Sequence, residues 1–104
     1  MIRISVLYPA GEGKKFDHAY YKNKHMTLVG ERLKPFGLIR TEVDRGIAGG
    51  APGSSAPYVA VGHVYFTALD GFQKGMGKHG KEIMADIPNY TNIQPQIQIN
   101  EIIG

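Results

Sequence analysis

Cysteine is missing from this chain of 104 residues. Its absence excludes disulfides, thiolate metal sites, iron–sulfur clusters and cysteine nucleophiles in one step. Long apolar runs are missing too, since none approaches the ~20 residues that cross a bilayer. The apolar part of residues 1–8 is too short and too interrupted for a signal peptide. The sequence therefore predicts a cytoplasmic protein that has no membrane partner.

A large excess of one charge is also absent. The chain has 12 Lys and Arg residues against 9 Asp and Glu residues, which gives a formal net charge of +3. The one basic stripe (Lys74, Lys78 and Lys81) has helical spacing and shares its segment with acidic residues, so it indicates a solvated helix face. The segment 58–66 also lacks the Lys/Arg-Gly-aromatic run with which RNA-recognition strands stack bases. We therefore expect no nucleic-acid partner.

What remains is the composition of one globular domain. Hydrophobic residues make up 42% of the chain and charged residues 20%, which is typical of a folded core rather than of a disordered segment. A length of 104 residues suits one domain, and we expect it to span residues 1–104.

Two hydrophobic periods alternate along the chain. A period of two predicts strands, and a period of three to four predicts helices. The expected strands cover residues 2–8, 38–45, 58–66 and 94–103. The expected helices run from Asp17, a plausible N-cap, to Lys34, and from a capping box at Thr67–Asp70 to the break at Pro88.

The order of these elements is β-α-β-β-α-β. In the α+β class, antiparallel pairing of such elements gives the ferredoxin-like sandwich, a four-stranded antiparallel sheet with two helices on one face. The segment Gly46–Pro57, rich in Gly and Pro, is predicted to be a long, mobile loop that acts as a lid.

The third strand is apolar on both of its faces. Small residues allow close approach, so we expect Ala60 and Gly62 to face the helices. Val61, His63 and Tyr65 then point to the open face of the sheet. Because large apolar patches usually mark partner surfaces, the sequence predicts a homodimer that packs sheet to sheet around a semi-polar cavity.

Four segments resemble the EthD family, named for ethyl tert-butyl ether degradation. They cover most of the chain: Phe16-Asp17-x-x-Tyr20-Tyr21-x-x-x-His25-Met26-x-Leu28-Val29, Glu42-x-Asp44-Arg45-Gly46-x-Ala48-Gly49-Gly50-x-Pro52, Val61-Gly62-His63, and Glu82-Ile83-Met84-Ala85-Asp86-Ile87-Pro88-Asn89-Tyr90-Thr91-x-Ile93-x-Pro95. The resemblance implies a dimeric α/β barrel of two ferredoxin-like subunits. It implies a reaction less firmly, because members and structural relatives include isomerases, polyketide cyclases, decarboxylases and monooxygenases.

His25 is the first candidate for catalysis. It lies one helical turn after Tyr21, so a phenol and an imidazole can share a face and bind each other or a ligand. An imidazole beside a partly apolar cavity suits acid–base work on an enol, a lactone or a phenolic carbonyl. The alternative is a core histidine whose hydrogen bonds are all made within the chain. With the family resemblance taken into account, we give the two interpretations equal weight. His63 is the second candidate if it faces the cavity, and is structural otherwise.

Four further residues are predicted to contact the substrate. Val61 and Tyr65 would form cavity walls, and Asn89 and Tyr90 precede the last strand, where a Tyr at the rim could close over a ligand. The four histidines have no metal-ligand spacing, so no metal site is predicted. No cofactor is predicted either. Because some dimeric barrels bind haem through a His, haem held between the subunits by His25 or His63 is a weak alternative.

Two functions remain open at this point. The first is an enzyme of cofactor-free acid–base chemistry or oxygenation, acting on a small, mostly apolar carbonyl or phenolic compound in xenobiotic or secondary metabolism. The second is a non-catalytic module that binds such a compound and carries it to a partner enzyme. A titratable pair that converges on the cavity would favour the enzyme.

Overall fold

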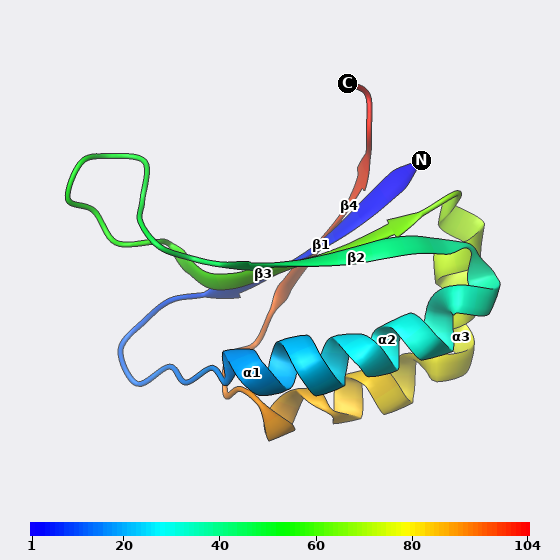
Figure 1. Ribbon diagram of the computed structural model, residues 1–104, viewed down its shortest axis with the longest axis horizontal. Coiled ribbons are helices and arrows are strands. Elements are labelled where there is room, and N and C mark those ends of the chain that lie inside the picture. The colour runs from blue at the N-terminus through cyan, green and yellow to red at the C-terminus, as the bar shows by residue number, and fades with distance from the viewer.

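Four antiparallel strands form the sheet of the computed structural model, which describes residues 1–104. They are β1 (Ile2–Pro9), β2 (Leu38–Arg45), β3 (Tyr58–Phe66) and β4 (Gln96–Glu101), in the order β2-β3-β1-β4. Figure 1 shows both helical segments on the same side of the sheet. The predicted α+β, ferredoxin-like architecture is therefore confirmed.

The last strand is shorter than the predicted range of 94–103. Pro95 has no N–H to donate to a ladder, and β4 begins at the next residue. Its other end is set by its neighbour, because Glu101 pairs with Ile2, where β1 begins. Beyond that point β4 has no strand to pair with.

The first helical segment is continuous but changes pitch. It comprises α1 (His18–Tyr20), the π-helix η1 (Tyr21–His25), α2 (Met26–Leu33) and the 3₁₀-helix η2 (Lys34–Phe36). Asp17 is its N-cap, as predicted, and accepts a hydrogen bond from the Tyr20 N–H at 3.0 Å. In η1 the Met26 N–H reaches back five residues to the Tyr21 carbonyl. Such π turns are rare and are frequent at functional sites.

The second helical segment comprises α3 (Leu69–Ala85) and the 3₁₀-helix η3 (Ile87–Asn89). The predicted capping box is wrong, because the N-cap is Ala68 and no side chain caps the helix. Thr67 instead follows directly after β3, where its N–H donates to the Gly37 carbonyl at 3.2 Å. That contact joins the start of α3 to the end of the first helical segment.

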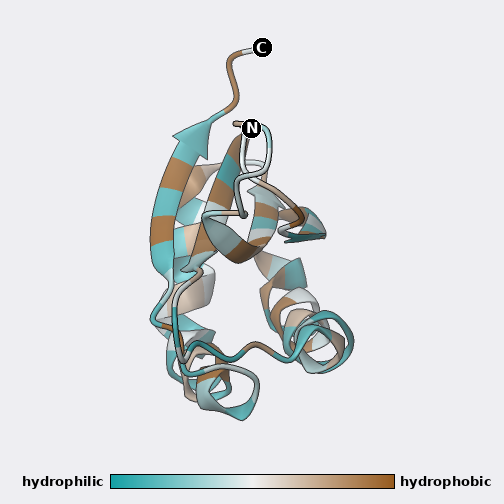
Figure 2. Ribbon diagram, turned by 90° about the vertical axis from the view of Figure 1, so that its left-hand side faces the viewer, coloured by the Kyte–Doolittle hydropathy of each residue, from teal (hydrophilic) through white to brown (hydrophobic).

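The core lies between the sheet and the helices. Its largest fully buried side chains are Ile4, Tyr8, Tyr21, Leu33 and Phe66. The predicted orientation of β3 is confirmed, since Ala60 and Gly62 are buried on the helix side. Figure 2 shows hydrophobic and hydrophilic residues alternating along the strand that ends near the C-terminus.

The opposite face of the sheet has no helix over it (Figure 1). The segment 46–57 projects beyond the ends of β2 and β3 and closes on itself, with the Gly49 N–H donating to the Ser54 carbonyl at 3.0 Å. Its mobility stays a prediction. No helix has the length and apolar character that crossing a membrane would require.

Candidate functional site

A cavity of about 70 Å³ lies between the sheet and the helices. Hydrophobic residues from β1, β3, α2 and α3 form nearly all of its lining, and the imidazole of His25 is its most readily titratable group. Met84 and Ile97 line the cavity and are also 45% and 52% exposed. The cavity therefore opens to solvent between α3 and β4.

His25 is held against the inner end of this cavity by η1. Tyr21 and His25, the first and last residues of η1, are both buried, whereas the three residues between them are exposed. The His25 side chain is enclosed by the fold, since the residue is only 4% exposed. Its Nδ1 lies 3.0 Å from Oδ2 of Asp86.

Asp86 is itself fixed by neighbours. Its Oδ1 accepts hydrogen bonds from the Tyr20 hydroxyl at 2.7 Å and from Asn89 Nδ2 at 2.9 Å. Burial raises the pKa of Asp86, but the hydrogen bonds from Tyr20, Asn89 and His25 together hold that pKa below its usual range. Asp86 is therefore a carboxylate at neutral pH and accepts the proton of His25.

The protonation of His25 follows from its surroundings. Burial lowers the pKa of His25, and the hydrogen bond and charge of Asp86 only partly oppose this, so the pKa stays below its ordinary value. The ring is therefore neutral at neutral pH. Because Asp86 accepts from Nδ1–H, the lone pair of the neutral ring is on Nε2, which has no hydrogen-bond partner within the chain. This is the tautomer that a general base needs.

Aromatic rings enclose His25. The Tyr21 ring stacks on it at 5.6 Å between centroids, and the Tyr90 ring lies 4.7 Å away. The Tyr90 hydroxyl shares a hydrogen bond of 2.6 Å with the Tyr8 hydroxyl. Burial raises the pKa of Tyr8, Tyr21 and Tyr90, so all three phenols keep their protons at neutral pH. The shared face predicted for Tyr21 and His25 is present, but the two side chains stack and do not hydrogen-bond.

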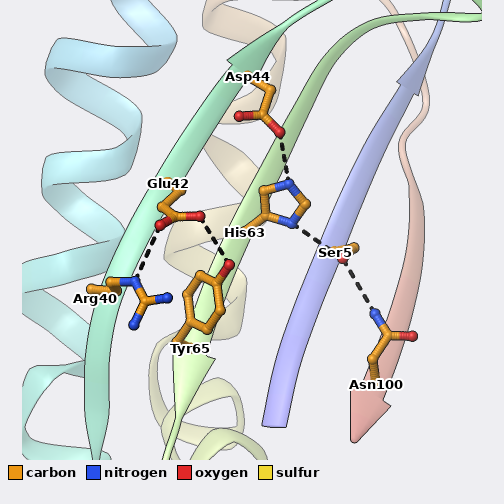
Figure 3. Close-up of polar contacts among 7 residues, drawn as sticks. All are labelled: Ser5, Arg40, Glu42, Asp44, His63, Tyr65 and Asn100. Atoms are coloured by element: carbon orange, nitrogen blue, oxygen red, sulfur yellow. Dashed lines mark hydrogen bonds and ion pairs between the residues drawn. The ribbon is translucent and has the colours of Figure 1, made fainter. Parts of the chain in front are cut away.

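A second polar cluster lies on the open face of the sheet, in front of the helices (Figure 3). His63 Nε2 lies 2.9 Å from Asp44 Oδ2, and His63 Nδ1 lies 3.3 Å from Ser5 Oγ. Asn100 Nδ2 donates to Ser5 Oγ at 3.3 Å. The register explains this row, because Ser5 pairs with His63 across β1 and β3.

Tyr65 anchors the other half of the open-face cluster. Its hydroxyl donates to Glu42 at 2.9 Å, and the Arg40 guanidinium lies 3.9 Å above its ring (Figure 3). Arg40 Nε also donates to Glu42 at 3.2 Å. Hydrogen bonds from Tyr65 and Arg40 lower the pKa of Glu42, which is therefore charged.

The hydrogen bonds of this cluster run in the order of a nucleophilic triad, from Ser5 to His63 and from His63 to Asp44. A serine nucleophile also needs free donors for the oxyanion, most often backbone amides. Ser5 is in the central strand β1, which pairs with β3 on one side and β4 on the other, so the amides around it are used in the ladders. We therefore regard this row as a structural network.

The structure divides the predicted site residues between two faces of the sheet. Four of them are on the helix side, where Tyr90 is 3% exposed and Asn89 supports Asp86: His25, Tyr21, Tyr90 and Asn89.

The predicted residues of an open-face cavity are not in the lining of the helix-side cavity: His63, Val61 and Tyr65. The two catalytic candidates His25 and His63 do not meet, because alternate residues of β3 point to opposite sides of the sheet and His63 is on the open face. The functional assignment of these residues stays a prediction.

Sequence reasoning missed Asp86 as the partner of His25. The two residues are 61 positions apart, and no local spacing connects them. The only signal was the place of Asp86 inside the last of the four EthD-like segments. No three His, Asp or Glu side chains converge anywhere in the chain in the way that a metal ion requires.

The comparisons with known proteins agree with this architecture. The EthD domain model matches residues 10–94. An EthD-like protein from Ralstonia eutropha JMP134 is 40% identical, with a TM-score of 0.93 over 99% of this chain and 92% of its own. An ethyl tert-butyl ether degradation (EthD) family protein from Bacillus halodurans C-125 is 22% identical, with a TM-score of 0.75 over 99% of each chain.

A more distant structure shares the fold alone. It is a dimeric ferredoxin-like protein of unknown function from Thermobifida fusca YX, 14% identical, with a TM-score of 0.57 over 97% of this chain and 90% of its own. No curated protein matches the sequence. On the match over residues 10–94 and the 40% identity to an EthD-like protein, this chain is a member of the EthD family.

Proposed function

We propose that the protein binds a small, mostly apolar carbonyl or phenolic compound in the helix-side cavity and transfers a proton on it. The observation that carries the proposal is the neutral His25, whose Nδ1 is held by Asp86 at 3.0 Å while Nε2 is left with a free lone pair. A buried base beside an apolar cavity is suited to removing a proton from a carbon next to a carbonyl, or from a phenol.

The residues in and beside the cavity supply each part of such a step. Nε2 of His25 takes the proton, and the Asp86 carboxylate stabilises the imidazolium that forms. Tyr21 lines the same cavity with a protonated phenol, which is a suitable donor to the enolate oxygen. Return of the proton to another atom completes an isomerisation or a cyclisation. This chemistry needs no cofactor, so none is part of the proposal.

The volume of the cavity limits the ligand. An engineered cavity of ~150 Å³ admits benzene, whereas this one measures about 70 Å³. Three methionines (Met26, Met76 and Met84) line it, and methionine side chains rearrange easily. We infer that a compound of about the size of one ring enters when these side chains move.

Hydrogen exchange tests this proposal. Cyclohexanone in D₂O is the probe, and NMR measures both its binding and the replacement of its α-hydrogens. We expect exchange to fall by ~10²-fold or more in His25→Gln, with His79→Gln on α3 as the matched control. Binding without exchange in the wild-type protein would favour a carrier, and native mass spectrometry of freshly purified protein would then identify the bound compound.

We propose further that the protein is a homodimer formed through the open face of the sheet. Val59 and Val61 are only half-buried there, and Arg3 Nε is buried without an acceptor in its own chain. A second copy would cover the valines and can supply the acceptor. The Thermobifida fusca protein, described as dimeric, has the same fold, which supports this arrangement.

A further inference from the structure

A second hollow lies on the other side of the first helical segment, between that segment and the edge strand β2. Its volume is about 480 Å³ and it is open to solvent. Six residues line this hollow, which we call the basic groove: His18, Lys22, Met26, Thr41, Val43 and Arg45. Three of them are basic, one is a hydroxyl, and none is a carboxylate.

Two cations of the basic groove, Lys22 and Arg45, have no ion-pair partner within the chain. Both are free to extend toward solvent. Burial lowers the pKa of His18, and the charge of Arg45 lowers it further, against a smaller opposite effect of Asp17. His18 is therefore neutral at neutral pH, and the positive charge of the groove comes from Lys22 and Arg45. An anion placed in the groove would pair with these two cations.

Met26 connects the basic groove to the cavity that holds His25. It is the one residue that lines both spaces. The same π-helix η1 supplies Lys22 to the groove and His25 to the cavity. A flexible methionine side chain thus borders both a cationic, solvent-open space and an apolar space that contains a base.

We propose that the basic groove binds the carboxylate of an organic anion whose apolar part occupies the cavity behind Met26. A guanidinium, an ammonium and a hydroxyl are the donors that recognise a carboxylate, and Arg45, Lys22 and Thr41 supply one of each. The inference rests on the proposed function for its apolar half, and it narrows the substrate class to aryl or alkyl carboxylates.

Benzoate and benzyl alcohol are matched probes, since they differ in charge but not in the ring. Proteins with ¹³C-labelled methionine methyl groups allow binding to be followed at Met26 and Met76, which line the cavity. In the wild-type protein we expect benzoate to bind more tightly than benzyl alcohol. In Lys22→Gln/Arg45→Gln we expect benzoate affinity to fall about tenfold or more, since the carboxylate loses both of its charged donors.

The controls separate the two proposals. Lys78→Gln removes a cation from the outer face of α3 and should leave benzoate affinity within about twofold of wild type, as expected for a remote surface charge. Benzyl alcohol should bind equally to all three proteins. Benzoate binding that is insensitive to the double substitution would overturn the carboxylate site alone. Failure of benzyl alcohol to shift the methyl resonances of the wild-type protein would instead overturn the cavity as the ligand site.

Discussion

At the scale of a single residue, two effects act on the pKa of the His25 imidazole in opposite directions. Burial disfavours its charged form, and the Asp86 carboxylate favours it, but burial has the larger effect. The folded chain therefore binds a proton at His25 less readily than the unfolded chain does. Asp86 also has a pKa below its usual range, so both members of the pair favour the folded state at neutral pH rather than in acid.

This difference predicts how stability depends on pH. As the pH falls below about 6.5, the ordinary pKa of histidine, the unfolded chain takes up a proton first. Stability should then fall until the pH has passed the lower pKa of folded His25. Melting temperatures measured from pH 8 to pH 5 should decrease more steeply for the wild-type protein than for His25→Gln. His18 also has a lowered pKa but is present in both proteins, so parallel curves would contradict our assignment for His25.

Gly62 shows how one missing side chain makes room for the site. A Cβ atom at this position would collide with the Tyr21 hydroxyl. We therefore expect Gly62→Ala to lower the free energy of unfolding by ~1–3 kcal/mol, the usual cost of overpacking. It should also change the chemical shifts of the Tyr21 ring.

Gly30→Ala in α2 is the control for this substitution. Nothing lies within 4 Å of a Cβ built at Gly30, so the added methyl should stabilise the helix by up to ~1 kcal/mol. Denaturant titration measures both changes. If Gly62→Ala were as stable as the wild-type protein, Tyr21 would not be packed against β3 as described.

At the scale of the element, a glycine determines how closely α3 packs against the first helical segment. A Cβ at Gly75 would lie 2.8 Å from Leu33 Cδ2 and 3.2 Å from Phe36 Cγ, so this glycine allows α3 to approach the first helical segment closely. Gly77, two residues later, has nothing within 4 Å of the same position. The two glycines cost the helix similar backbone entropy, but only Gly75 is required by packing.

The same substitution should therefore have opposite effects at these two positions. We expect Gly75→Ala to lower the free energy of unfolding by ~1–3 kcal/mol through overpacking. We expect Gly77→Ala to raise it by ~0.5–1 kcal/mol, because alanine is the better helix former. Urea unfolding followed by circular dichroism compares them within one helix. Equal effects of the two substitutions would show that Gly75 is not at a close contact.

At the scale of the whole molecule, the sheet has one covered face and one uncovered face. The helices bury the core on one side, while the open-face cluster of Figure 3 has half-buried valines beside it. A strand with apolar residues on both faces is usually covered on both. A second copy of the chain is the partner that we propose for this face.

The proposed dimer predicts the mass of the protein in solution. Light scattering at micromolar concentration should give twice the mass of one chain. Val61→Asp would place a charge in the interface and should give a monomer, because an unpaired buried charge is costly. Ile47→Asp is the control, since Ile47 is 91% exposed in the loop. A monomeric wild-type protein would overturn the dimer.

The sequence alone determined the features that depend on neighbours along the chain. Alternating residues marked all four strands, Asp17 marked the start of the first helical segment, and the small residues of β3 marked the side that faces the helices. The four EthD-like segments identified the family. Each of these signals is local, because the side-chain period and the capping hydrogen bond involve residues only a few positions apart.

Only the tertiary structure decided which residues meet. The Thr67 N–H donates to the Gly37 carbonyl, 30 positions earlier in the chain, and α3 begins one residue later than predicted, with Ala68 as its N-cap. His25 is paired with Asp86 rather than with His63, since β3 sends Gly62 and His63 to opposite sides of the sheet. Contacts of this kind depend on how the helices pack on the sheet, and the spacing of residues within one element contains no information about that packing.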